Sequence, residues 1–113
     1  MSDCDCNTGT FEFPTVKSGC SLVGFEITIS EEDAQADLAD VSIRFKLPGS
    51  DAWLLTLTVA DGLEILQATS PWIVSVLDRT VVSLAAGLHI GEMVTTDVDG
   101  ITEVFLEPTW PII

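Results

Sequence analysis

The chain has 113 residues, of which 47% are hydrophobic, and its mean hydropathy is +0.43. This size predicts one domain with one core, and the apolar content excludes a disordered protein because these side chains need burial. The 18 acidic residues against 4 basic ones give a formal charge of −14. Such a surface repels phosphate, so nucleic acid and anionic membranes are excluded as expected partners.

The first 20 residues are small and polar, and we expect them to form an extension that lies on the domain or on a neighbour. They lack the basic and apolar segments of a secretory signal peptide. No apolar run in the chain reaches the roughly 18 to 20 residues of a membrane-spanning helix. The cytoplasm is therefore the expected place of folding. Within the extension, residues 11–14 (FEFP) alternate as one edge strand would.

Strand-type alternation of apolar and polar residues follows from about residue 21 onward. It predicts strands at 23–29, 41–47, 53–59, 63–67, 70–77, 88–95 and 101–106. Gly, Pro and Asp residues separate most of them, as turns require. The acidic stretch 30–40 predicts one helical turn capped by Ser30, and 78–87 a short turn or helical bridge. The whole pattern predicts an all-β protein, either a sandwich or a small barrel.

The stretch TTDVDGITE (95–103) allows two interpretations. Asp97 and Asp99 stand two residues apart before a glycine, as in half of a calcium-binding loop, whereas Asp-Gly between two strands indicates a hairpin turn. If they are the third and fifth residues of such a loop, its twelfth position falls on Leu106, which cannot bind calcium. The hairpin turn is favoured, and Asp97 and Asp99 remain the candidates for calcium.

Three cysteines near the start of the chain could bind zinc together with the single histidine. Cys4, Cys6, Cys20 and His89 are ligand types that zinc accepts, but the spacing departs from the usual one, so reduced thiols are favoured. No GxSxG, HExxH, P-loop or GxGxxG motif occurs, and a hydrolase triad would need His89 as its base. We expect no enzymatic activity and no cofactor.

A corner motif precedes one of the late strands. Residues 84–89 read LAAGLH, and the pattern L-x-x-G-x-Y of immunoglobulin-like folds places a tyrosine whose hydroxyl bonds the main chain. Leu84, Gly87 and His89 occupy its three fixed positions. A ring nitrogen of His89 could make the same hydrogen bond, so we expect a structural role for this residue.

Four stretches, 36–45, 60–65, 84–89 and 96–100, form an ordered series. In order and spacing they resemble the immunoglobulin-like domains of tail and baseplate proteins of tailed bacteriophages, especially the N-terminal domain of baseplate upper proteins. Two positions depart from that pattern, since Ala39-Asp40 stands where Thr-Gly is usual and His89 replaces the tyrosine.

The resemblance implies an immunoglobulin-like antiparallel β-sandwich of about seven to eight strands over residues 21–113. It also implies a non-enzymatic structural subunit of a virion tail. Its expected partners are other tail proteins and further copies of the same chain.

Apolar residues near both ends of the chain could pair with the sheet edge of a neighbour or complete the chain's own core. They are Phe11, Phe13, Trp110, Ile112 and Ile113. An alternative function is a carbohydrate-binding or adhesion module, in which Trp53, Trp72 or Trp110 offers its ring to a sugar. A calcium-stabilised extracellular repeat unit is a weaker alternative. Because tryptophans at alternating strand positions are more often core residues, the exposure of these rings separates the first two functions.

Overall fold

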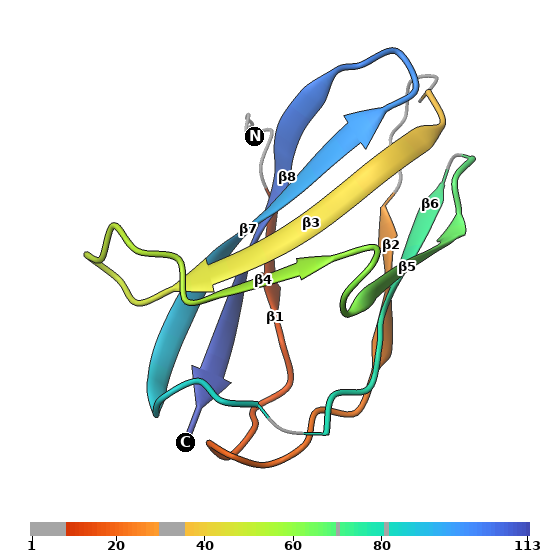
Figure 1. Ribbon diagram of the computed structural model, residues 1–113. Coiled ribbons are helices and arrows are strands. Elements are labelled where there is room, and N and C mark those ends of the chain that lie inside the picture. The colour runs from red at the N-terminus through yellow and green to blue at the C-terminus, as the bar shows by residue number, and fades with distance from the viewer. Residues whose placement is uncertain (1–8, 30–35, 70, 81) are drawn as a thin grey trace.

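The computed structural model describes residues 9–29, 36–69, 71–80 and 82–113, and this part of the chain contains eight strands and no helix (Figure 1). The strands are β1 (Gly9–Glu12), β2 (Phe25–Ile29), β3 (Leu38–Lys46), β4 (Leu55–Thr58), β5 (Leu63–Gln67), β6 (Trp72–Val76), β7 (Gly87–Asp97) and β8 (Thr102–Ile112). The prediction of an all-β protein is confirmed.

The strands form two sheets that face each other as a β-sandwich (Figure 1). One sheet has five strands in the order β1-β8-β7-β3-β4, and the other has three in the order β2-β6-β5. Neighbouring strands are antiparallel, except that β1 runs parallel to β8 at the edge of the larger sheet. In Figure 1 the smaller sheet stands on the right-hand side of the molecule.

Every second side chain is buried in β6 and, after its bulge, in β3, as expected for strands with one face on a core. The buried members of these two strands are Leu38, Val41, Ile43, Phe45, Trp72, Val74 and Val76. The residues between them point away from the core. Each sheet therefore has an inner face on the core and an outer face towards solvent.

The aromatic centre of the core is built around Phe13, which is 1% exposed. Its ring centroid lies 4.9 Å from that of Phe25, 5.0 Å from that of Phe45 and 5.1 Å from that of Trp110. Edge-to-face and tilted ring pairs of this kind are favourable. Val16 is buried as well. Residues 9–16, expected to belong to an extension, thus contribute an edge strand and core side chains to the sandwich.

β8 is longer than the strand predicted at 101–106 and continues to Ile112. The prediction stopped early because two prolines follow, and proline lacks the N–H that a strand normally donates. The main-chain carbonyls of these prolines and of their neighbours can still accept hydrogen bonds. The N–H of Phe13 donates to Thr109 O at 2.7 Å, and the N–H of Val16 donates to Pro111 O at 3.2 Å. The N-terminal segment therefore supplies donors that extend β8.

Other strand boundaries also differ from the prediction. β2 begins at Phe25, and Val23, predicted to share its buried face, is 76% exposed. β4 is shorter than the predicted 53–59. β3 begins three residues early, at Leu38, because a bulge lets Leu38 pair with Asp97 of β7.

Two connections were predicted to contain helical turns. The turn capped by Ser30 falls largely on residues 30–35, which lie outside the described residues. The described part of 78–87 contains no helix and pairs with the chain near residue 20 instead. Leu22 and Arg79 exchange main-chain hydrogen bonds of 2.8 and 2.9 Å, and the N–H of Val82 donates to Cys20 O at 2.8 Å.

Candidate functional site

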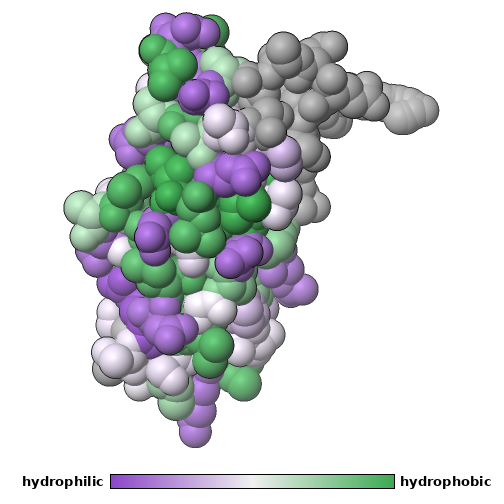
Figure 2. All heavy atoms as spheres, turned by 90° about the vertical axis from the view of Figure 1, so that its right-hand side faces the viewer, coloured by the Kyte–Doolittle hydropathy of each residue, from purple (hydrophilic) through white to green (hydrophobic). Residues whose placement is uncertain are grey.

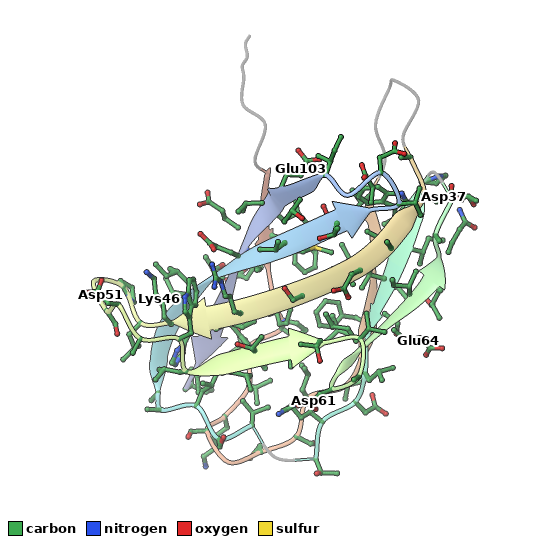
Figure 3. All side chains as sticks on the ribbon, turned by 45° about the horizontal axis from the view of Figure 1, so that its top comes forward. Asp37, Lys46, Asp51, Asp61, Glu64 and Glu103 are labelled. Atoms are coloured by element: carbon green, nitrogen blue, oxygen red, sulfur yellow. The ribbon has the colours of Figure 1, made fainter. Side chains whose placement is uncertain are left out.

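A cleft of about 420 Å³ opens on the outer face of the five-stranded sheet. Its lining includes Lys46, Trp53, Ile90, Glu92, Glu107 and Thr109. Lys46 pairs with Ile90 and Ile90 pairs with Thr109, so β3, β7 and β8 each contribute one residue to the same row across the sheet. We call this site the Trp53 cleft. Figure 3 shows that Lys46 lies at the end of β3 beside the loop carrying Asp51.

Two cations position the side chains at one end of the Trp53 cleft. The guanidinium carbon of Arg44 lies 4.1 Å from the ring centroid of Trp53, and Lys46 Nζ lies 4.8 Å from it. Arg44 Nη2 also donates to Glu92 Oε1 at 2.8 Å across the β3–β7 ladder. Each cation–π contact at such a partly exposed place contributes about 0.5–1 kcal/mol. These contacts hold the indole ring over the outer face of β3.

Gly91 brings β7 close to β3 beneath this cleft. A Cβ atom at Gly91 would lie 2.6 Å from the carbonyl oxygen of Arg44 and 2.9 Å from Cδ1 of Phe45. Such distances are shorter than atoms tolerate, so any larger residue would force the strands apart.

A second surface lies on the outer face of the smaller sheet. Figure 2 views the molecule from this side and shows apolar atoms gathered in the middle of the face, with polar residues around them. Leu66 of β5 is 47% exposed, Leu77 directly after β6 is 40% exposed, and Ile73 of β6 is half-buried. Glu26 of β2 and Glu64 of β5 both pair with Ser75 of β6, so a carboxylate stands on each side of the central strand. We call this surface the small-sheet face.

Only one of the three tryptophans reaches the surface. Trp72 and Trp110 are 2% and 0% exposed, and their indole N–H groups donate to Ala36 O at 3.0 Å and to Pro14 O at 2.9 Å. Neither ring can stack on a ligand. Of the three candidate sugar platforms, only Trp53 is left.

Most of the apolar residues near the two ends of the chain are buried in its own core. Phe13, Trp110 and Ile112 are at most 2% exposed, so of the two alternatives these three side chains complete the chain's own core and are not available to an interface. Phe11 is half-buried and packs against the core, and Ile113 is 68% exposed. The chain's own core takes these side chains because the N-terminal segment and β8 lie side by side.

Asp97 and Asp99, the two aspartates of the stretch TTDVDGITE, lie at the turn between β7 and β8. Asp97 Oδ1 accepts hydrogen bonds from the N–H groups of Asp99 and Ile101, each at 3.0 Å. Gly100 has a φ of +84°, in the left-handed region that glycine adopts without strain. The hairpin turn is therefore present, and the carboxylate of Asp97 fixes its shape.

No metal-binding group of three or more His, Cys, Asp or Glu side chains occurs among the residues that the structure describes. Of the zinc candidates, Cys4 and Cys6 lie outside the described residues, and Cys20 is exposed. His89 is fully buried. The structure does not bring Cys20 and His89 into one ligand cluster.

The corner residues lie where β7 begins. Leu84 is buried, and Gly87 has a φ of +139°, which favours glycine. His89 Nε2 lies 2.8 Å from Ala85 O, so this nitrogen carries the proton and donates it. It is the main-chain hydrogen bond expected of this ring. No described residue bonds the other ring nitrogen, Nδ1, which is also buried.

Four residues of the Trp53 cleft were not singled out from the sequence: Lys46, Glu92, Glu107 and Thr109. Alternation along each strand turns their side chains outward, but their meeting depends on which strands are neighbours. The one local signal was that two of the four basic residues, Arg44 and Lys46, stand two apart and hence on the same face of a strand.

Compared with models of known protein families and with curated proteins, the sequence matches none. In the part of the chain that the structure describes, there is no helix of the length and apolarity needed to span a membrane.

Proposed function

We propose that this chain is a non-enzymatic structural subunit of the tail of a bacteriophage or prophage, where it acts through protein–protein contacts. The proposal begins with the four-part motif series, which resembles immunoglobulin-like domains of tail and baseplate proteins. The observation that carries it is the order of the strands in the two sheets.

In variable-type immunoglobulin sandwiches one sheet contains strands G, F, C and C′ in that order, and the other contains B, E and D. Here β8, β7, β3 and β4 have the first order, and β2, β6 and β5 have the second. Neither order follows the chain, because β3 lies beside β7 and β2 lies beside β6. Agreement in two such orders supports the immunoglobulin-like part of the proposal.

The corner at the start of β7 supports the same assignment. In immunoglobulin sandwiches a tyrosine near the start of strand F bonds main chain a few residues upstream. His89 stands near the start of β7 and bonds the carbonyl of Ala85, four residues upstream. A different side chain thus closes the corner with the same type of hydrogen bond.

The burial of His89 supports a role without catalysis. It is the only histidine in the sequence, and its side chain is 0% exposed. A general base must come within hydrogen-bonding distance of the proton that it removes. His89 is sealed in the core and bonded to the main chain, so it cannot reach a substrate.

The small-sheet face is the surface that we assign to contact with other tail proteins. Its centre is apolar, with Leu66 and Leu77 exposed, and its flanks carry Glu26 and Glu64. Exposed apolar patches with a polar rim are typical of protein interaction sites. Because the chain has a formal charge of −14, copies repel each other, so the partner at this face supplies basic residues. Several copies then enter one assembly through that partner.

The test uses tail particles purified from cells that produce this chain, with the chain quantified by mass spectrometry. Two variants are matched, because Leu66 on the small-sheet face is 47% exposed and Leu88 on the outer face of β7 is 50% exposed. Wild type and Leu88→Glu are expected in the particles in equal amounts. Leu66→Glu is expected to fall at least tenfold, since the new carboxylate would be buried at the apolar centre of the contact, away from the flanks where basic residues meet Glu26 and Glu64.

Absence of the wild-type chain from purified particles would contradict the tail proposal. Incorporation of Leu66→Glu at the wild-type level would instead contradict the assignment of the small-sheet face. Melting temperatures of both variants, measured on the isolated proteins, separate loss of contact from loss of folding.

A further inference from the structure

The Trp53 cleft lies on the five-stranded sheet, whereas the proposed assembly contact uses the other sheet. Its volume of about 420 Å³ is within the range of small-molecule sites, which is roughly 300–1,000 Å³. Three strands, β3, β7 and β8, supply most of its lining, and they are central members of their sheet. The strand residues of the cleft keep their geometry better than loop residues would, whereas Trp53 lies in the connection between β3 and β4.

The indole ring of Trp53 is positioned before any ligand arrives. Arg44 and Lys46 lie 4.1 and 4.8 Å from its centroid, and Arg44 is itself bonded to Glu92. A ring held in this way loses little conformational freedom on binding. The other two tryptophans are buried. Of the three, only Trp53 places a half-exposed indole ring next to a cleft.

The charges around the Trp53 cleft balance. Lys46, Glu92 and Glu107 line the cleft, and Arg44 lies outside the lining but forms an ion pair with Glu92. The two positive and two negative charges of these four residues sum to zero. The whole chain has a formal charge of −14. A local balance within so acidic a chain favours a ligand without net charge, because a cation would meet Arg44 and Lys46 and an anion would meet the two glutamates.

The polar groups at the cleft provide both acceptors and donors. Glu107 is exposed and makes no ion pair with a described residue, so its carboxylate is available to accept hydrogen bonds. Lys46 and Thr109 supply donors from neighbouring strands, and Ile90 lies between them. The cleft therefore combines an aromatic surface and an aliphatic side chain with a carboxylate, an ammonium and a hydroxyl.

We propose that the Trp53 cleft binds an uncharged saccharide. A pyranose ring has an apolar face of C–H groups that can pack on the part of the indole ring that Arg44 and Lys46 leave exposed. It also has a rim of hydroxyls that donate to carboxylates and accept from ammonium and hydroxyl groups. Glu107 is assigned to the sugar hydroxyls as acceptor, and Lys46 and Thr109 as donors. This inference does not depend on the tail proposal and would hold for an isolated domain.

The test begins with an array of glycans that carries uncharged oligosaccharides of hexoses and N-acetylhexosamines beside sialylated and sulfated ones. The uncharged oligosaccharide bound best is then titrated against the purified chain by isothermal calorimetry. Trp53→Ala is expected to weaken binding at least tenfold, because it removes the stacking surface. Glu107→Gln is expected to weaken it about tenfold, because it keeps the size of the side chain and removes its charge. Leu88→Ala, on the same face outside the cleft, is the control with unchanged affinity.

Two results would overturn the proposal. The first is retention of no uncharged glycan, or of sialylated and sulfated glycans only. The second is full affinity in both Trp53→Ala and Glu107→Gln. Trp53 is outside the buried core but loses two cation–π contacts in this variant, so its melting temperature should fall by no more than about 8 °C. If Trp53→Ala fails to fold, the exposed Glu107→Gln carries the test alone.

Discussion

Phe13 stands at the point where the N-terminal segment, β2, β3 and β8 meet in the core. Its ring contacts those of Phe25, Phe45 and Trp110 at centroid distances between 4.9 and 5.1 Å, and it is 1% exposed. We predict that Phe13→Ala destabilises the fold strongly. Truncation of a buried phenylalanine costs about 3–5 kcal/mol, since the lost apolar contacts leave a cavity.

That cost is a large part of the total stability expected for one domain, which is about 5–15 kcal/mol. At roughly 4 °C per kcal/mol for a domain of this size, the melting temperature should fall by about 12–20 °C. Urea unfolding followed by tryptophan fluorescence measures the change directly, because the Trp110 ring lies 5.1 Å from that of Phe13.

Val23→Ala is the control, since Val23 precedes β2 and is 76% exposed. Its free energy of unfolding should match that of wild type within about 0.5 kcal/mol. If Phe13→Ala lowers the free energy of unfolding by less than about 1 kcal/mol, the predicted role of Phe13 in the core is wrong. It would mean that the N-terminal segment lies on the sandwich without completing its core.

Two further predictions concern the corner and the hairpin turn. His89→Gln places an amide nitrogen near the position of Nε2 and should keep the bond to Ala85 O, whereas His89→Asn should lose it and be about 1–3 kcal/mol less stable than His89→Gln by urea unfolding. Equal stability of the two variants would show that the bond does not hold the corner. Asp97→Ala removes the acceptor of two main-chain N–H groups and should cost about 1–2 kcal/mol, while Asp97→Asn keeps an oxygen and should cost less than about 0.5 kcal/mol. Millimolar calcium should leave the melting temperature of wild type unchanged, and a rise of several degrees that Asp97→Asn abolishes would restore the calcium interpretation.

The strands were predictable where the burial signal is local. In β3 and β6 the side chains alternate between core and surface, and this period of two can be read from consecutive residues. The length of β8 was not predictable in this way, because its extension past two prolines depends on donors from Phe13 and Val16, nearly a hundred residues away in the chain. The parallel ladder that joins Gly9 to Leu106 has the same long-range origin.

The Trp53 cleft was only partly predictable for a related reason. Trp53 was among three candidate rings, but its exposure could be told from that of Trp72 and Trp110 only after the core was known. Lys46 and Glu107 come from strands that are not neighbours, since β7 lies between β3 and β8. The alternation within one strand predicts which of its side chains point outward. It does not predict which outward side chains of different strands lie next to each other.

Electron cryo-microscopy of tail particles from cells that produce this chain would show directly whether the chain is a tail subunit. We expect density for the eight-stranded sandwich in several copies per tail, with the small-sheet face, including Leu66, covered by a neighbouring protein that contributes basic side chains. Tails of normal form that contain no such density, with the chain recovered only outside the particles, would contradict it.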